Sequence, residues 1–173
     1  MKQELLHKYD TINNIKNKLL NKVAKYSQEE LNKVPEYGGW SAGQVLFHVA
    51  FAESGTILVI NKNLAENKVY LKGNFRSVLS NIFLVISLKL PLKFKAPKAV
   101  SKVPDSITFE EISNYFDKNT QDFKKILEEL PNELENKLIF KHPRAGLFTI
   151  HQTLNFTREH YLHHESQLDR LLK

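Results

Sequence analysis

The sequence predicts an all-α protein in which four long helices form a bundle, with an extra segment inserted between the second and the third. Two observations predict this fold. Apolar residues recur at steps of three, four and seven positions along four long segments, which is the pattern of a helix that buries one face. In no segment do apolar and polar residues alternate over several positions, so a sheet is not expected.

Capping signals place the starts of the helices. A Ser or Thr followed three positions later by Glu or Gln forms a capping box, which satisfies two backbone N–H groups at a helix start. The pattern occurs at Ser27, Ser41 and Thr108. Together with the apolar stripes, it predicts a short turn from Ser27 to Pro35 and long helices over about 2–25, 41–67, 108–130 and 149–172.

The predicted insert, approximately 67–105, carries the positive charge of the chain. The whole sequence has 25 Lys and Arg residues against 19 Asp and Glu residues, a net charge of +6. Residues 67–104 contain eight Lys or Arg and no acidic residue, so +6 for the whole chain and +8 for this segment leave −2 for the rest. Because the basic character is local, nucleic acid is not an expected partner.

Residues 75–90 within the insert are mainly apolar, but serines interrupt the stretch and Pro91 ends it. It is shorter than the ~20 residues that span a bilayer. We interpret it as a fifth helix packed on the bundle, followed by an extended connection over 91–104. An interfacial helix with lysines at lipid headgroups is the alternative, although a membrane surface is not the expected partner. The chain is expected to be a monomer or a homodimer.

Seven histidines are present, and two of them mark one face of the last helix. At 100° per residue, His160 and His164 lie about 40° apart on the helix, and imidazoles one turn apart can bind one metal ion. A pair of core histidines with satisfied hydrogen bonds would have the same spacing. His163 points away from this stripe and is expected either at the surface or in contact with a metal ligand without binding the metal itself.

His48 strengthens the metal interpretation. It lies two turns into the second helix among apolar residues, where it either supplies a third nitrogen across the bundle or acts as a hydrogen-bonded core group. Three neutral imidazoles leave one coordination position open, as in catalytic zinc sites. Gln44 and Glu53 are candidates for residues that support the metal ligands without binding the metal themselves. Capping of the second helix explains Gln44 equally well, and a solvent-exposed acid is the stronger interpretation of Glu53. No catalytic residue is assigned.

Three strings of residues resemble the DinB/YfiT-like superfamily. Residues 40–48, Trp-Ser-Ala-Gly-Gln-Val-Leu-Phe-His, resemble the start of the second helix in that superfamily. Residues 160–167, His-Tyr-Leu-His-His-Glu-Ser-Gln, resemble its final helix. Residues 142–146, His-Pro-Arg-Ala-Gly, resemble a His-Pro-x-x-Gly loop that precedes the last helix in a bacterial branch of the superfamily.

The resemblance implies an up-down-down-up four-helix bundle, here a single domain over 1–173. It also implies one divalent metal ion held by His48, His160 and His164, whereas a turn before Pro143 explains His142. Imidazole suits zinc, nickel, iron and manganese, and zinc is slightly favoured among them. Relatives are similar to thiol-dependent transferases that use bacillithiol, mycothiol or glutathione, to maleylpyruvate isomerases and to metal-dependent hydrolases.

Composition limits the chemistry that the chain itself can supply. It has no cysteine, which excludes a cysteine nucleophile, cysteine-ligated zinc and Fe–S clusters. A thiol reaction therefore needs a small-molecule cosubstrate, for example an anionic low-molecular-weight thiol attracted by the basic segment. We expect a metal-dependent transferase or hydrolase. The alternatives are a metal-binding or sensing protein without turnover and a membrane-surface module. The polar N-terminal residues predict a cytoplasmic protein.

Overall fold

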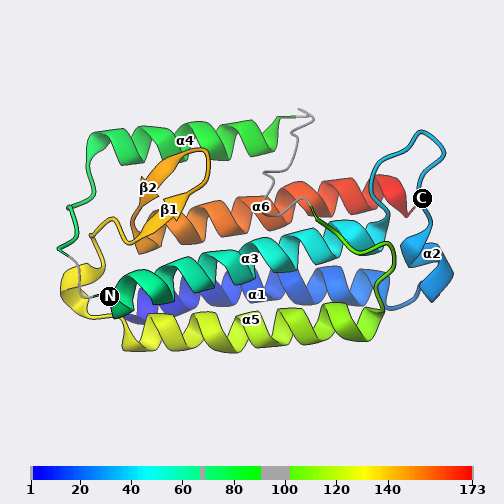
Figure 1. The fold of residues 1–173 in the computed structure, drawn as a ribbon, viewed down its shortest axis with the longest axis horizontal. Coiled ribbons are helices and arrows are strands. Elements are labelled where there is room, and N and C mark those ends of the chain that lie inside the picture. The colour runs from blue at the N-terminus through cyan, green and yellow to red at the C-terminus, as the bar shows by residue number, and fades with distance from the viewer. Residues whose placement is uncertain (1, 67–68, 91–101, 173) are drawn as a thin grey trace.

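A computed structural model describes residues 2–66, 69–90 and 102–172 of the chain (Figure 1). Most of these residues are helical, so the prediction of an all-α protein is confirmed apart from one short hairpin. The elements, in chain order, are α1 (Lys2–Val23), α2 (Gln28–Asn32), α3 (Ala42–Ala65), α4 (Phe75–Lys89), α5 (Phe109–Glu129), a 3₁₀ turn (Asn132–Leu134), β1 (Phe140–His142), β2 (Gly146–Phe148) and α6 (Ile150–Leu171).

The predicted capping boxes are present at the starts of α2, α3 and α5. The side chains of Ser27, Ser41 and Thr108 each accept a hydrogen bond from the backbone N–H three residues later, and the side chain at that later position bonds back to the cap. Asn74 and Thr149 form the same reciprocal arrangement at α4 and α6. Each box satisfies two backbone donors that a helix start leaves without intrahelical partners.

The four long helices α1, α3, α5 and α6 lie side by side, and α4 lies outside them (Figure 1). α3 contacts α5 and α6, and α1 contacts the same two helices. α1 and α6 run in one direction, whereas α3 and α5 run in the other. This arrangement surrounds a single interior that all four helices share.

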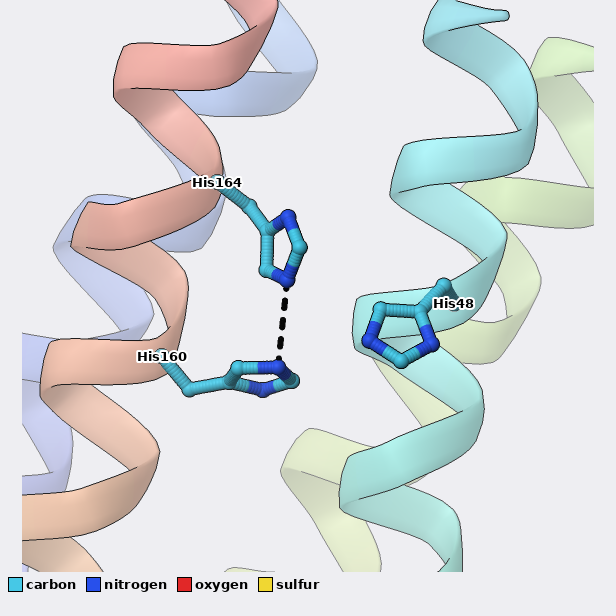
Figure 2. A group of neighbouring side chains, drawn as sticks. All are labelled: His48, His160 and His164. Atoms are coloured by element: carbon cyan, nitrogen blue, oxygen red, sulfur yellow. Dashed lines mark hydrogen bonds between the residues drawn. The ribbon is translucent and has the colours of Figure 1, made fainter. Parts of the chain in front are cut away.

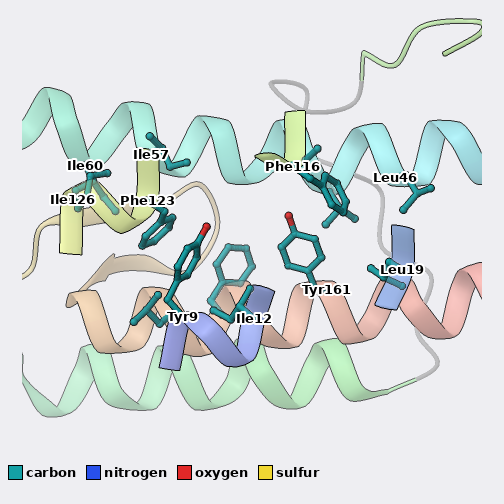
Figure 3. Close-up of a cluster of buried hydrophobic side chains, with 14 of the residues drawn as sticks. Tyr9, Ile12, Leu19, Leu46, Ile57, Ile60, Phe116, Phe123, Ile126 and Tyr161 are labelled. Carbon is teal, nitrogen blue, oxygen red and sulfur yellow. The ribbon is translucent and has the colours of Figure 1, made fainter. Parts of the chain in front are cut away.

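Large apolar side chains from each of these helices fill that interior (Figure 3). Leu19 of α1, Leu46 of α3, Phe116 of α5 and Tyr161 of α6 are almost fully buried. Burial of one such side chain contributes about 1.5–3 kcal/mol to stability, so this core is the main force that holds the helices together.

Among the described residues, α3 is long and apolar enough to cross a membrane when only length and composition are considered. However, 61% of its most apolar 18-residue stretch is buried inside the protein. A core helix meets the same two criteria, and its contacts with α5 and α6 account for its apolar composition.

The expectation that no sheet forms is wrong for one short segment. β1 pairs with β2 in an antiparallel hairpin, with Phe140 opposite Phe148 and His142 opposite Gly146. Strands of three residues are too short for an alternating pattern to show in the sequence. Gly146 has a φ of +85°, a conformation that side chains with a Cβ rarely adopt, so glycine permits the turn.

The helix predicted within the insert is present as α4, which contacts α6 and β2. Polar side chains attach it to α6. Asn81 donates a hydrogen bond to the backbone oxygen of Gln152, whose side-chain amide donates to Ser77. The Nδ1–H of His163 donates to the backbone oxygen of Leu88 at 2.6 Å. Most of the connection predicted over 91–104 lies outside the described residues.

Candidate metal centre

Three histidine rings from two helices face one another inside the molecule (Figure 2). His48 comes from the first half of α3, and His160 and His164 come from successive turns of α6. The ring centroid of His48 is 5.3 Å from that of His160 and 5.1 Å from that of His164, and the last two are 4.7 Å apart. One nitrogen from each ring lies within 4.8 Å of the other two. The structure therefore brings the three predicted ligands to one point.

The spacing of the nitrogens suits a divalent ion. Nitrogens bound tetrahedrally to zinc, each at ~2.0–2.1 Å from the ion, lie about 3.3 Å apart. The Nε2 atoms of His160 and His164 are 3.1 Å apart. One nitrogen of His48 lies within 4.8 Å of a nitrogen of each of the other two rings, so the residues present fit the metal that the sequence predicts.

Gln167 determines which nitrogen of His164 is available. Its Oε1 accepts a hydrogen bond from Nδ1 of His164 at 2.9 Å. Because a carbonyl oxygen only accepts, Nδ1 carries the proton, and Nε2 keeps its lone pair on the side of His160. Metal-binding histidines usually have such a partner on the second nitrogen. Sequence reasoning did not include Gln167 in the site, although its spacing of three residues from His164 was the available signal.

The surroundings keep the rings of His160 and His164 neutral. His48 and His164 are buried, and His160 is half-buried. Burial, followed by the neighbouring rings of His164 and His48, lowers the pKa of His160 well below its ordinary value. Burial, followed by the rings of His48 and His163, lowers the pKa of His164 to about 3. Neutral imidazole is the form that binds a metal ion.

Aromatic side chains hold two of the rings in place. The ring of Trp40 lies 4.9 Å from that of His48, and the ring of Phe156 stacks on that of His160 at 5.4 Å. Phe156 also contacts His142, with their centroids 4.6 Å apart. Sequence reasoning did not single out Phe156, although it lies four residues before His160 and therefore on the same face of α6.

The side chain of Gln44 forms hydrogen bonds with the backbone at the start of α3. Its Oε1 accepts the backbone N–H of Ser41 at 3.0 Å, and its Nε2 donates to the backbone oxygen of Pro104 at 2.9 Å. Of the two sequence-based interpretations, capping is the one that these hydrogen bonds support.

The expectation that Glu53 is exposed to solvent is wrong, because the residue is only 3% exposed. Its carboxylate accepts hydrogen bonds from the hydroxyl groups of Tyr9 and Tyr161 at 2.9 and 2.7 Å, and lies 2.8 Å from Nζ of Lys16. A carboxylate is stable in a core only when a cation and hydrogen-bond donors compensate its lost hydration. These partners come from α1 and α6, so the sequence around Glu53 carried no sign of them.

His142 lies beside the cluster and forms a turn, as the sequence predicts. Its Nδ1 accepts backbone N–H groups from Ala145 at 3.0 Å and from Arg144 at 3.3 Å. Burial, followed by the positive charge of Arg144, lowers the pKa of His142 to about 4. Its nitrogen thus closes the hairpin turn before α6.

The cluster borders a large open groove of about 2370 Å³. α3, α4, α6, the hairpin and the loop before α3 form its walls. Among its described lining residues the only acid is Glu159, which forms ion pairs with Lys89 and Arg158. The groove is therefore positively charged, and its basic lining residues are Arg76, Lys89, Lys141, Arg144, Arg158 and Arg170.

Comparison with known proteins gives one match. A model of the DinB superfamily matches residues 15–168, which include the three histidines, the hairpin and α4. No curated protein and no solved structure matches the chain. Because the match covers most of the sequence, the chain belongs to the DinB superfamily.

Proposed function

We propose that the protein is a metal-dependent enzyme, either a hydrolase or a thiol-dependent transferase, in which His48, His160 and His164 hold one divalent ion. The observation that carries this proposal is the convergence of one nitrogen from each ring within 4.8 Å. A divalent ion on three imidazoles retains an open coordination position and supplies an activated water or thiolate near neutral pH. Zinc, nickel, iron and manganese all suit these ligands, and zinc is our first choice.

The other residues of the site have supporting roles. Gln167 fixes the proton and orientation of His164, while Trp40 and Phe156 restrict the rings of the other two histidines. The positive groove attracts a small anionic substrate. Since the chain has no cysteine, a transferase of this kind takes its thiol from an anionic low-molecular-weight cosubstrate in the groove.

We further infer that α1, α3, α5 and α6 form an up-down-down-up four-helix bundle within one domain over 1–173. Two observations support this topology. α1 and α6 run opposite to α3 and α5, and each helix contacts two of the others around the shared core. Facing helices of such bundles commonly carry metal ligands in their interior.

Metal analysis of protein purified without a histidine tag or added metal tests the site. We expect about one divalent ion per chain in the wild type and nearly none in His164→Ala, which removes one of three ligands. His163→Ala is the matched control, because it removes the neighbouring imidazole, which bonds to the backbone of Leu88. Equal metal content in wild type and His164→Ala after incubation with zinc contradicts the site.

Activity of the metal-loaded protein tests whether the site is catalytic. We expect hydrolysis of ester or amide substrates, or thiol transfer, that is lost in His48→Ala and retained in His163→Ala. A protein that binds one ion per chain but turns over neither class of substrate is a metal-binding or sensing protein, and that result overturns the proposed enzyme.

A further inference from the structure

α4 packs on the protein through Ser77 and Asn81, with Leu84 and Leu88 beside them, and turns a wide apolar side toward solvent. Ser77 and Asn81 are each 5% exposed, and both are hydrogen bonded to Gln152 of α6. A helix packed on a soluble bundle normally has the opposite orientation, with its apolar stripe inward. The outward residues form the apolar stripe of α4, defined as Phe75, Val78, Leu79, Ile82, Phe83, Ile86 and the C-cap Leu90.

The apolar stripe is continuous and unusually concentrated. Of the fourteen exposed large apolar side chains among the described residues, seven belong to it. At 100° per residue they cover an arc of roughly 140° along the whole helix. Scattered apolar residues are normal on a protein surface, but a contiguous patch marks a surface that binds another molecule.

A basic residue lies near each end of the apolar stripe, and the one at the C-terminal end, Lys89, also pairs with Glu159. Arg76 and Lys89 lie near the two ends of α4, and both are exposed. Residues 67–104, which include the helix, contain eight basic residues and no acid. An apolar helix face flanked by Lys and Arg complements an anionic lipid surface, where acyl chains lie directly beneath negatively charged headgroups.

The dimensions of α4 favour a position in the plane of that surface. Its 15 residues make it ~22 Å long, shorter than the ~30 Å hydrocarbon core of a bilayer.

A second copy of the chain is a poorer partner for the apolar stripe than a lipid surface. A helix ~22 Å long and ~10 Å wide offers about 220 Å², against the ~800 Å² per partner of a standard interface. A two-fold contact through α4 would also bring two segments of like charge together.

We propose that α4 is an interfacial helix that docks the protein on a membrane surface rich in anionic lipid. Its apolar stripe enters the boundary between headgroups and acyl chains, and the basic residues bind lipid phosphates. The sequence alone favoured a fifth helix packed on the bundle over an interfacial helix, and the outward position of the apolar stripe is the reason to choose the interfacial helix here. This surface borders the groove through Arg76, Phe83 and Lys89, but it contains none of the three metal ligands, so vesicle binding and metal binding can be tested separately.

Binding to lipid vesicles tests the charge component. We expect the full chain to bind vesicles of equal parts phosphatidylcholine and phosphatidylglycerol, to bind pure phosphatidylcholine far less, and to dissociate as salt increases. The double variant Arg76→Gln, Lys89→Gln should bind the anionic vesicles about fivefold more weakly for each charge removed. The matched control, Lys118→Gln with Lys125→Gln, removes two exposed charges on α5, across the bundle from α4, and should bind like the wild type.

The apolar component is tested in the same assay. Ile82→Asp with Phe83→Asp should abolish vesicle binding, because both side chains lie on the apolar stripe. Val34→Asp changes an exposed apolar residue outside α4 and should have no effect. All these substitutions are on the surface, and circular dichroism checks that each variant is folded.

Three results overturn the proposal. The first is no binding to anionic vesicles. The second is binding that the substitutions on α4 reduce no more than their controls. The third is a stable dimer that Ile82→Asp with Phe83→Asp converts to a monomer, without any vesicle binding, which would assign the apolar stripe to a second copy. His48→Ala should bind vesicles normally, so failure of the metal site and failure of the docking surface are distinguishable.

Discussion

The two nitrogens of His164 have different roles. Nδ1 donates to Gln167, and Nε2 lies 3.1 Å from Nε2 of His160. In neutral imidazole one nitrogen donates and the other accepts, so the contact with Gln167 leaves Nε2 with a lone pair. A single amide on the next turn of α6 thereby prepares the ring for a metal ion before the ion arrives.

Replacing Gln167 should therefore weaken metal binding without removing a ligand. We expect Gln167→Leu to lower zinc affinity about 10–100-fold, the usual effect of losing a hydrogen-bond partner of a ligating histidine. Gln167→Glu retains an acceptor at this position and should preserve the affinity. Competition with a chromophoric zinc chelator measures all three proteins. Equal affinities for the wild type and Gln167→Leu would show that the amide does not orient the ring.

The histidine positions show what sequence can and cannot predict at this scale. The i, i+4 spacing places His160 and His164 on one face of α6, and that relation follows from helix geometry alone. The contribution of His48 depends on how α3 and α6 pack together, which no local pattern encodes. Its inclusion rested on its apolar surroundings and on the family resemblance.

Between elements, a buried polar network connects the four long helices. Lys16 of α1 pairs with Glu53 of α3, and the hydroxyls of Tyr9 and Tyr161 donate to the same carboxylate. Tyr161 belongs to α6, and Lys16 also donates to Thr120 of α5, so the network joins all four long helices beside the apolar core. Burial is the largest influence on Lys16 and lowers its pKa, while Glu53 acts in the opposite direction.

Removing one charge from this network should cost more than removing both. Lys16→Met leaves an uncompensated buried carboxylate, and we expect the free energy of unfolding to fall by about 3–5 kcal/mol. Lys16→Met combined with Glu53→Gln removes both charges and retains an acceptor for the tyrosines, so it should recover much of the loss. Urea denaturation measures both variants. A single variant that loses less than about 1 kcal/mol would show that the pair is not energetically coupled.

Helix starts were predictable because a capping box is a local signal. Ser27, Ser41 and Thr108 fix the starts of α2, α3 and α5 through side chains only three residues away. The hairpin and the orientation of α4 were not predictable in the same way. Three-residue strands carry no period, and the apolar stripe of α4 does not indicate which side of the helix the protein covers.

Across the whole molecule, the buried histidines make stability depend on pH. An ordinary histidine titrates near pH 6.5, but burial, followed by Arg144, lowers the pKa of His142 to about 4. The pKa values of His160 and His164 are also lowered, mainly by burial. Between about pH 6.5 and pH 4 the unfolded chain therefore binds more protons than the folded chain, so stability falls as the pH falls.

For His142 alone, the full shift in pKa corresponds to about 3 kcal/mol, of which about 2 kcal/mol is lost between pH 7.5 and pH 5. Urea denaturation at these two pH values, with a metal chelator present, measures the change. In His142→Asn the side-chain oxygen can replace Nδ1 as acceptor for Arg144 and Ala145 but does not titrate. We expect this variant to lose about 2 kcal/mol less than the wild type over the same range, whereas parallel losses in both proteins would show that His142 does not contribute to the acid sensitivity.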